Sequence, residues 1–509
     1  MGVVMVFEPN FKKVKSSVRR HIGTTQSIVE VKLPTNDAEL KEIYSVSAKA
    51  DILSAEISGK TINFIGLVDF QAIYQSGELS SLDYAAEFKD KFDVQEDLMG
   101  DLIVSSSVVE VNSGIVNSDI RATAIVEVSV DIIETNEYSV LVDIDAMGAY
   151  KSTKEINYST YLGKAIEKFD VASDIDILGA KSIYMVTPCV RLNSVLPKDN
   201  YIEATGVLGL DICYSTSDEL SGLKSTYREE PFTWELAYDG LDDRNYIATA
   251  LSIISNEIKV TSTPTEDGMN VSMSVPVELR GFVFESNKLS VVDDVYLESN
   301  YLSITSEVMP SIVDFGVASF KDNIAGSAEV TESAPFIDEI LSVSTNNIVL
   351  ARNYIEENRL VVEGVATATV VYYTKETSSA TSLQIEMAFA VEEKAGAMEA
   401  GVVTLCLSDI SAKSRRGKEI EVSGELCVYA DTYNYNESVV ISSVTLGEEK
   451  VQDDCSLYIY IVKPNETIWD IAKEMNVSTE LIMEQNPGLE LPLEAGQKLV
   501  IYKSRVMEF

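Results

Sequence analysis

The chain has 509 residues, of which 46% are hydrophobic, and its 81 acidic against 40 basic side chains give a formal net charge of −41. This length and apolar content allow roughly three to four domains with cores of their own. The negative charge disfavours binding of nucleic acid or of an anionic membrane through the body of the chain, and no run approaches the roughly 20 apolar residues that a membrane-spanning helix needs.

The first 23 residues carry the main basic patch of the chain. Its members are Lys12, Lys13, Lys15, Arg19 and Arg20. We expect a solvated basic tail over residues 1–23. The alternative is an electrostatic contact, either with an acidic partner or with the acidic body of the same chain. The opening does not resemble a secretion signal, because residues 8–10 interrupt a short apolar run and the basic residues follow that run.

From about residue 24 the sequence repeats itself. Residues 62–74, 202–214 and 360–372 align without gaps, and each has a Gly inside a β-rich run and a Tyr at its end. These pairs are Gly66 and Tyr74, Gly206 and Tyr214, and Gly364 and Tyr372. A second shared run lies upstream of each segment, at residues 46–52, 186–192 and 343–349, across a short turn-rich link. The pattern predicts a β-hairpin that occurs three times.

The repeated glycines and tyrosines have a structural interpretation. A Gly inside a strand usually marks a bulge or a close approach of another group, and a Tyr at a strand end usually packs its ring. A repeated small-molecule site at these positions is the alternative.

Each hairpin is followed by a further apolar segment and by alternating strands. The segments carry a Leu and then a Phe at matching places: Leu82 and Phe88, Leu223 and Phe232, Leu383 and Phe389. Almost no stretch of the body has a 3.6-residue period, so we expect a mainly β fold of three tandem sandwich-like units. The expected boundaries are 24–150, 151–305 and 306–449, followed by an acidic linker at 450–456.

The five cysteines are odd in number and contain no C-x-x-C pair. They are Cys189, Cys213, Cys406, Cys427 and Cys455. We expect reduced, mostly buried thiols of an intracellular protein.

Residues 457–503 form a separate module that reads as strand, helix, helix and strand. Thr467 is placed to cap the first helix together with Asp470, and Ser478 to cap the second. This makes a small α+β domain of βααβ order, in which Trp469, Ile471 and Ala472 are expected to supply core.

This module resembles the LysM domain, a βααβ fold that usually binds N-acetylglucosamine glycans. The resemblance rests on the run around T-I-W-D-I-A, on N-P-G-L, and on Gly496 before the last strand. It implies a shallow groove between two loops, formed by Asn465, Glu466, Thr467, Ile468, Asn486, Pro487, Gly488 and Leu489. The family usually has Gly-Asp where this chain has Asn465 and Glu466; Asn tolerates the left-handed backbone, and the Glu adds a charge that suits a basic protein surface.

The repeats resemble the SPOCS domain of sporulation proteins, and tandem SPOCS units before a LysM module resemble the SipL-type family of spore coat morphogenetic proteins. The resemblance implies a scaffold of the mother-cell cytoplasm that is recruited to the forespore surface. There the module would bind a SpoIVA-like coat ATPase, and the β units would contact other coat proteins.

Enzyme signatures are missing from the sequence. It has one histidine, His21, no phosphate-binding loop and no G-x-S-x-G motif, so we expect no enzyme, no cofactor and no metal site. Two alternatives stay open. One is a peptidoglycan-binding wall or cortex protein, as the LysM resemblance implies. The other is a hydrolase with paired carboxylates in one β unit.

Overall fold

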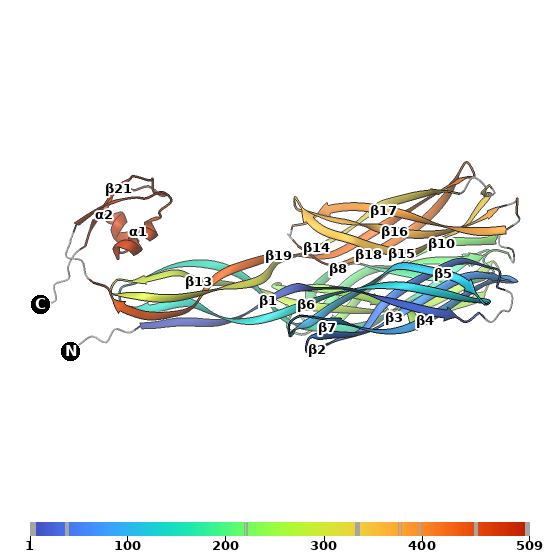
Figure 1. The fold of residues 1–509 in the computed structure, drawn as a ribbon, viewed down its shortest axis with the longest axis horizontal. Helices are drawn as coiled ribbons and strands as arrows, with labels where there is room; N and C mark the ends of the chain where they lie inside the picture. The colour runs from blue at the N-terminus through green and yellow to red at the C-terminus, as the bar shows by residue number, and fades with distance from the viewer. Residues whose placement is uncertain are drawn as a thin grey trace.

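The structure is a computed structural model that describes residues 7–35, 40–217, 219, 222–330, 336–374, 376–377, 379–396, 399–451 and 457–503. Three β units lie side by side in an elongated body, a narrow arm of long strands leaves one end of it, and a small module sits near the tip of that arm (Figure 1). The prediction of a mainly β fold with a small C-terminal α+β module is confirmed.

Each unit consists of two sheets. In unit 1 one sheet has the order β1 (Phe7–Leu33), β6 (Asp119–Ala146), β5 (Asp101–Val116), and the other is β2 (Glu42–Ser58), β3 (Thr61–Ser76), β4 (Glu78–Asp93). In unit 2 β13 (Gly268–Leu297) pairs with β7 (Ala149–Leu178) on one side and with β11 (Asn245–Ile253) and β12 (Lys259–Pro264) on the other; its second sheet is β8 (Ser182–Lys198), β9 (Tyr201–Ser215), β10 (Leu223–Ala237). A short 3-10 turn, Ser255–Glu257, lies between β11 and β12.

Unit 3 repeats the plan of unit 1. Its sheets are β14 (Asn300–Glu329), β19 (Glu419–Glu449), β18 (Glu399–Arg415) and β15 (Glu339–Glu356), β16 (Arg359–Thr374), β17 (Ser379–Lys394). In every unit the first strand therefore pairs with the last, which closes the unit on itself.

The core of each unit lies between its two sheets. The alternation along β6 buries Val126, Val128 and Val130 completely, and they meet Phe64 and Phe70 of β3 in one apolar cluster. Units 2 and 3 have equivalent clusters. Two sheets that face each other through alternating side chains form a sandwich, as the sequence pattern predicts.

The three predicted hairpins are present as β2–β3, β8–β9 and β15–β16. Their shared glycines have the predicted structural role, which Gly206 illustrates. Its partner strand has a bulge between Leu192 and Ser194, and a Cβ on Gly206 would lie 2.3 Å from the ring of Phe232, its cross-strand neighbour. Gly66 with Phe88 and Gly364 with Phe389 repeat this arrangement.

The arm, which we call the stalk, consists of three antiparallel ribbons: residues 7–21 with 131–146, 149–161 with 284–297, and 300–313 with 434–449. Irregular pairing separates the stalk from the body in each ribbon, for example between His21 and Gly23. Buried side chains from all three ribbons, among them Val14, Val291 and Val440, fill the middle of the stalk.

The N-terminal stretch is part of this stalk. Residues 7–23 belong to β1, so the expectation of a solvated tail is wrong for them, and residues 1–6 lie outside the described part of the chain. The basic side chains pair with β6: Lys13 with Glu137 at 2.7 Å, and Arg20 with Glu134 at 2.8 Å. Of the alternatives drawn from the sequence, the contact with the acidic body holds for these residues.

The inner edges of the sheets face one another in the body. Within unit 1 the edge strands β2 and β5 lie together, as do β8 and β11 in unit 2 and β15 and β18 in unit 3. Between units β5 contacts β15, β18 contacts β8, and β11 contacts β2, which completes a ring around a common axis. The ring covers edges that would otherwise offer unpaired backbone groups to other chains.

Side chains help to satisfy these inner edges. Asn347 of β15 donates from Nδ2 to the carbonyl oxygens of Val108 (3.2 Å) and Val109 (2.8 Å) on β5, and Gln71 of β3 donates to the carbonyl of Val186 on β8 at 3.4 Å. The three units are thus joined by polar contacts as well as by apolar packing.

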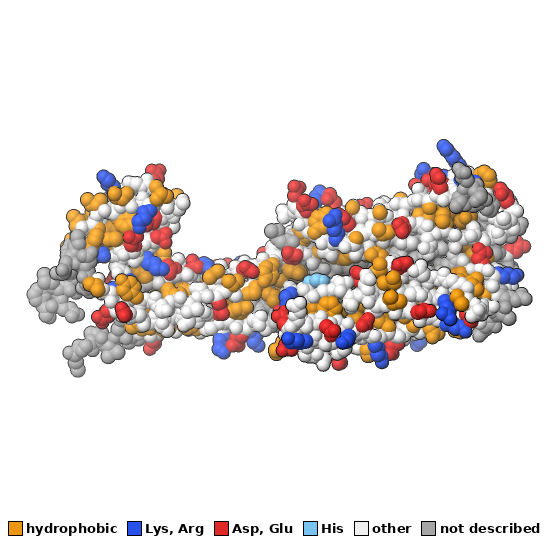
Figure 2. Space-filling view, viewed as in Figure 1, with side chains coloured by type: hydrophobic (Ala, Val, Ile, Leu, Met, Phe, Trp, Pro, Cys, Tyr) orange, Lys and Arg blue, Asp and Glu red, His pale blue; other side chains and the backbone are white. Residues whose placement is uncertain are grey.

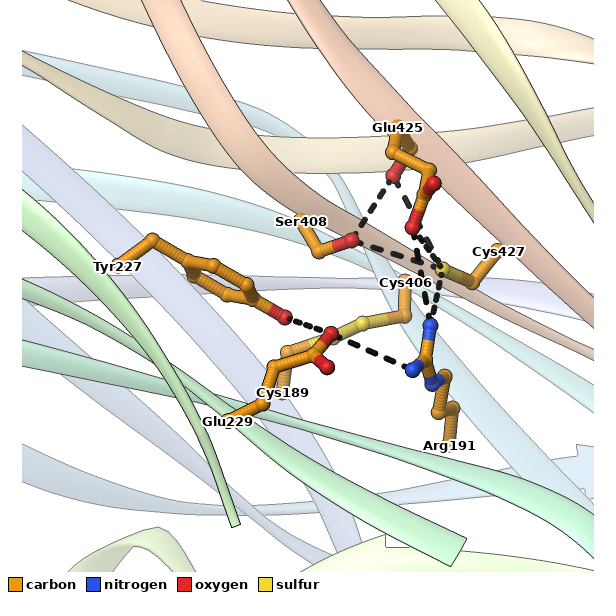
Figure 3. The surroundings of a disulfide bond; sticks show 8 residues. All are labelled: Cys189, Arg191, Tyr227, Glu229, Cys406, Ser408, Glu425 and Cys427. Carbon is orange, nitrogen blue, oxygen red and sulfur yellow. Dashed lines mark hydrogen bonds and ion pairs between the residues drawn. A yellow bond between two sulfur atoms is a disulfide. The ribbon is translucent and has the colours of Figure 1, made fainter. Parts of the chain in front are cut away.

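A disulfide joins unit 2 to unit 3. It connects Cys189 of β8 with Cys406 of β18, whose Cα atoms are 6.0 Å apart (Figure 3). The expectation of reduced thiols is wrong for this pair, because the ring of edge strands brings together two positions that are 217 residues apart. Cys213 and Cys427 are free and buried, and Cys455 lies outside the described residues.

The same contact carries a charged group. Arg191 of β8 donates to Glu229 Oε1 of its own unit at 3.2 Å and to the Cys427 sulfur of unit 3 at 3.2 Å (Figure 3). The guanidinium thus lies across the border between two units, beside the disulfide.

Candidate functional site

The C-terminal module is built from β20 (Leu457–Ile461), α1 (Ile468–Met475), α2 (Thr479–Gln485) and β21 (Lys498–Tyr502). The two strands form an antiparallel pair, and both predicted helix caps are present. The Thr467 hydroxyl accepts from the Asp470 amide at 3.2 Å while the Asp470 carboxylate accepts from the Thr467 amide at 2.9 Å, which is a complete capping box. Residues 452–456 of the predicted linker lie outside the described residues.

The first predicted groove loop contains Asn465 to Ile468. Asn465 has φ of 62°, so the prediction that Asn takes the left-handed backbone here is confirmed. Glu466 is more engaged than its sequence position suggests. Its carboxylate accepts from the Tyr460 hydroxyl at 2.6 Å and from the Lys463 amide at 2.8 Å. Burial alone would raise the pKa of Glu466, but these hydrogen bonds and the Lys463 ammonium together lower it.

The Glu466 side chain therefore holds the loop together. Only about 10% of the side chain is exposed, and its carboxylate forms an ion pair with the Lys463 ammonium at 3.4 Å. In the same loop Asn465 and Thr467 are exposed.

The second predicted groove loop contains Asn486 to Leu489. The Asn486 side chain donates from Nδ2 to the Val500 carbonyl and accepts at Oδ1 from the Val500 backbone N–H, both at 2.8 Å, so it attaches the end of α2 to β21. Pro487 and Gly488 are exposed, and Gly488 has a φ of 90° that an L side chain would strain. Leu489 packs on the module core, as does Ile468 of the first loop, so both loops are attached to one cluster.

The predicted core residues of the module occupy two different places. Ile471 and Ala472 are fully buried. Trp469 is half-buried at the edge of the same cluster, where it also contacts the stalk. Its ring centre lies 5.1 Å from that of Tyr296 in an edge-to-face arrangement, and its indole N–H donates to Asp294 Oδ2 at 2.9 Å.

Further contacts fix the module on the stalk tip. Lys473, one turn after Trp469, pairs with both oxygens of Asp294 at 2.7 Å. The Tyr296 hydroxyl donates to the Val477 carbonyl between the helices at 2.6 Å. Lys450, after the last stalk strand, donates to the side chain of Asn476 and to the Leu297 carbonyl.

The sequence did not predict this docking site, which we call the seat and which consists of Asp294, Tyr296 and Lys450 on the stalk side. Asp294 and Tyr296 lie in an alternating strand of unit 2, and nothing local marks them as partners of a module 175 residues downstream. A signal does exist in Trp469, because a Trp on a helix face that is not needed for the small core suggests an interface.

No three His, Cys, Asp or Glu side chains of the described residues are placed to hold a metal ion. Within the same residues no helix is long and apolar enough to cross a bilayer.

Comparison with known proteins assigns the module to a class. Residues 460–501 match the family model of the LysM domain, so the C-terminal part of the chain is a LysM domain. No curated protein and no solved structure matches the chain.

Proposed function

We propose that the chain is a non-enzymatic scaffold that presents its LysM domain to a protein partner. The observation that carries this proposal is the docking of the domain on the stalk tip. Trp469, Lys473 and Val477 face the stalk, whereas Asn465, Thr467 and Pro487 of the two loops stay exposed with the seat occupied. The domain stands clear of the three-unit body, with open space between them in the view of Figure 2.

The partner that we favour is the SpoIVA-like coat ATPase of the forespore surface, with the β units as sites for further coat proteins. Three repeats with the Gly and Tyr pattern followed by a LysM domain support this assignment. The exposed loop surface suits a protein partner because Asn465, Thr467 and Pro487 offer small, uncharged polar and apolar side chains.

Peptidoglycan is the second candidate ligand. The match of residues 460–501 to the LysM family favours it, since glycans are the usual ligands of that family. Glu466 does not distinguish a protein partner from a glycan, because its carboxylate accepts hydrogen bonds from Tyr460 and Lys463 and is not directed at a ligand in the groove.

Binding measurements on the full chain test both candidates. Pro487→Lys changes an exposed loop position, and Ile459→Lys is its matched control because Ile459 is also exposed but lies on the outer face of β20. We expect Pro487→Lys to weaken capture of the coat ATPase at least about tenfold and the control to bind like the parent chain. Glu466→Lys is a poor choice, because it would break the contacts that shape the loop.

A sedimentation assay with purified peptidoglycan completes the test. The glycan would be the better candidate if the full chain sediments with peptidoglycan, Pro487→Lys abolishes that sedimentation, and the chain does not capture the ATPase. Equal capture of the ATPase by both variants would show that the loops are not the binding surface.

A further inference from the structure

The ring of inner edge strands encloses a cavity of about 320 Å³ where the three units meet. All six strands of the ring contribute to its wall: β2, β5, β8, β11, β15 and β18. This volume lies at the lower end of the range for small-molecule sites.

Four ionisable side chains line the cavity. Lys49 and Asp51 come from β2, Asp69 from β3, and Asp211 from β9 of the neighbouring unit. One ammonium against three carboxylates leaves a net charge of −2 when all four are ionised. Within the described residues the side chains of Lys49, Asp69 and Asp211 make no hydrogen bond, and Asp51 has only a long one of 3.4 Å from Ser255.

The rest of the wall combines apolar side chains, among them Ala48, Val104 and Val190, with hydroxyl and amide side chains such as Ser106 and Asn347.

We propose that this cavity binds a small linear organic dication of the alkyl diamine class. Two ammonium groups would neutralise the charge of the wall and supply the donors that Asp69 and Asp211 lack. The carbon chain between them would lie against the apolar side chains. Asp69 and Asp211 come from different units, and neither is among the charges that act on the other, so a ligand with two separated charges suits them better than a single compact ion. No described trio of carboxylates is placed to hold a metal ion.

The charges behind the wall favour the same ligand. Asp83 lies near Asp69 and Asp409 lies near Asp211, and both add negative charge. Arg280 lies near Asp51 but is paired with Glu278 at 2.5 Å. Burial first, and then these neighbouring carboxylates, raise the pKa of Asp69 and of Asp211 to about 7. Burial raises the pKa of Asp51 to about 6 and lowers that of Lys49.

Isothermal titration of the full chain with 1,4-diaminobutane tests the proposal, with butane-1,4-diol as the neutral analogue and butylamine as the single cation. We expect saturable one-to-one binding of the diamine, roughly tenfold or more weaker binding of butylamine, and none of the diol. Near pH 7 binding should release protons, because the bound cation favours the ionised carboxylates. Titrations in buffers of different ionisation enthalpy measure that release.

A pair of double variants locates the site. Asp69→Asn with Asp211→Asn removes two cavity charges, and Asp97→Asn with Asp239→Asn removes two exposed charges from the same two units. The first should weaken diamine binding at least about tenfold, and the second should leave it unchanged. Equal weakening by both, or no saturable binding by the parent chain, would overturn the proposal.

A measurement without any variant protects the test against a folding defect. In a series from 1,3-diaminopropane to 1,8-diaminooctane, a cavity of fixed size gives an affinity maximum at one chain length. Loose attraction to an acidic surface gives no such maximum, and that result would also overturn the proposal.

Discussion

The indole N–H of Trp469 in the LysM domain donates to the carboxylate of Asp294 on the stalk at 2.9 Å. The same carboxylate pairs with Lys473, so one acidic side chain of unit 2 holds two residues of α1. The orientation of the domain is therefore set by a residue that belongs to neither its strands nor its helices.

Removal of this carboxylate should release the domain. In Asp294→Ala, the loss of the indole hydrogen bond and of the Lys473 ion pair should destabilise the docked arrangement by about 2–3 kcal/mol, while the LysM core, with Ile471 and Ala472, stays folded. The measurement is tryptophan fluorescence: Trp234 is only 7% exposed, so a red shift reports on Trp469. Asp293→Ala is the control, because Asp293 pairs with Lys154 instead. An unchanged emission in Asp294→Ala would contradict the docked role of Trp469.

The repeated glycines should not tolerate a methyl group. A Cβ on Gly206 would lie 2.3 Å from both the Arg191 carbonyl oxygen and the Phe232 ring, so Gly206→Ala should lower the free energy of unfolding by about 2 kcal/mol or more. Chemical denaturation measures the change. Gly114→Ala is the control, since nothing lies within 4 Å of its Cβ position. Equal stability of the two variants would show that the Phe rings move aside freely.

Stability should fall as the pH rises from about 4 to about 7. The pKa values of Asp69 and Asp211 are raised to about 7 in the folded chain, against roughly 3.9 in the unfolded chain. In that window the folded state binds more protons than the unfolded state, so the free energy of unfolding decreases with pH and levels off above pH 7. Thermal melting between pH 5 and 8 measures this slope.

The slope should be smaller in Asp69→Asn with Asp211→Asn, because asparagine does not titrate. Asp97→Asn with Asp239→Asn should keep the slope of the parent chain, since both positions are exposed. Parallel melting curves for all three proteins would mean that the cavity carboxylates titrate normally.

The disulfide between Cys189 and Cys406 can be detected by counting the free thiols of the chain. Alkylation of the denatured chain should add two fewer groups without reductant than with it. Cys189→Ser with Cys406→Ser should lose that difference and should lower the free energy of unfolding by up to about 4 kcal/mol. Cys213→Ser should keep the difference of two, because Cys213 is a free thiol. Identical counts with and without reductant in the parent chain would rule out the bond.

Local pattern predicted the hairpins and the LysM domain because their information is short-range. The hairpin across residues 198–201 and the Thr467 cap each depend on residues a few positions apart. Pairing of the first strand of a unit with its last is different. Phe7 lies opposite Ala146, and residues 7–23 alternate poorly, so nothing local distinguishes this strand from a tail.

The site was predictable in its parts but not in its setting. The loop residues Asn465 and Thr467 have the backbone and cap that their types suggest. The hydrogen bond from Tyr460 to Glu466 depends on side-chain geometry between β20 and the loop. The contact of Trp469 with Asp294 joins residues that are 175 positions apart, so it depends on the tertiary fold. The cavity likewise needs three units around one axis, so Lys49 reads in sequence only as a polar residue in a repeated run.

The stalk has a mechanical consequence. Its strands run from the body to the tip, with inter-strand hydrogen bonds perpendicular to the long axis. A pull on an occupied LysM domain would therefore act along the strands and strain many backbone bonds in shear at the same moment, instead of peeling them apart one by one. The weakest link under tension would be the seat at Asp294, so force should detach the domain before it unravels the ribbons.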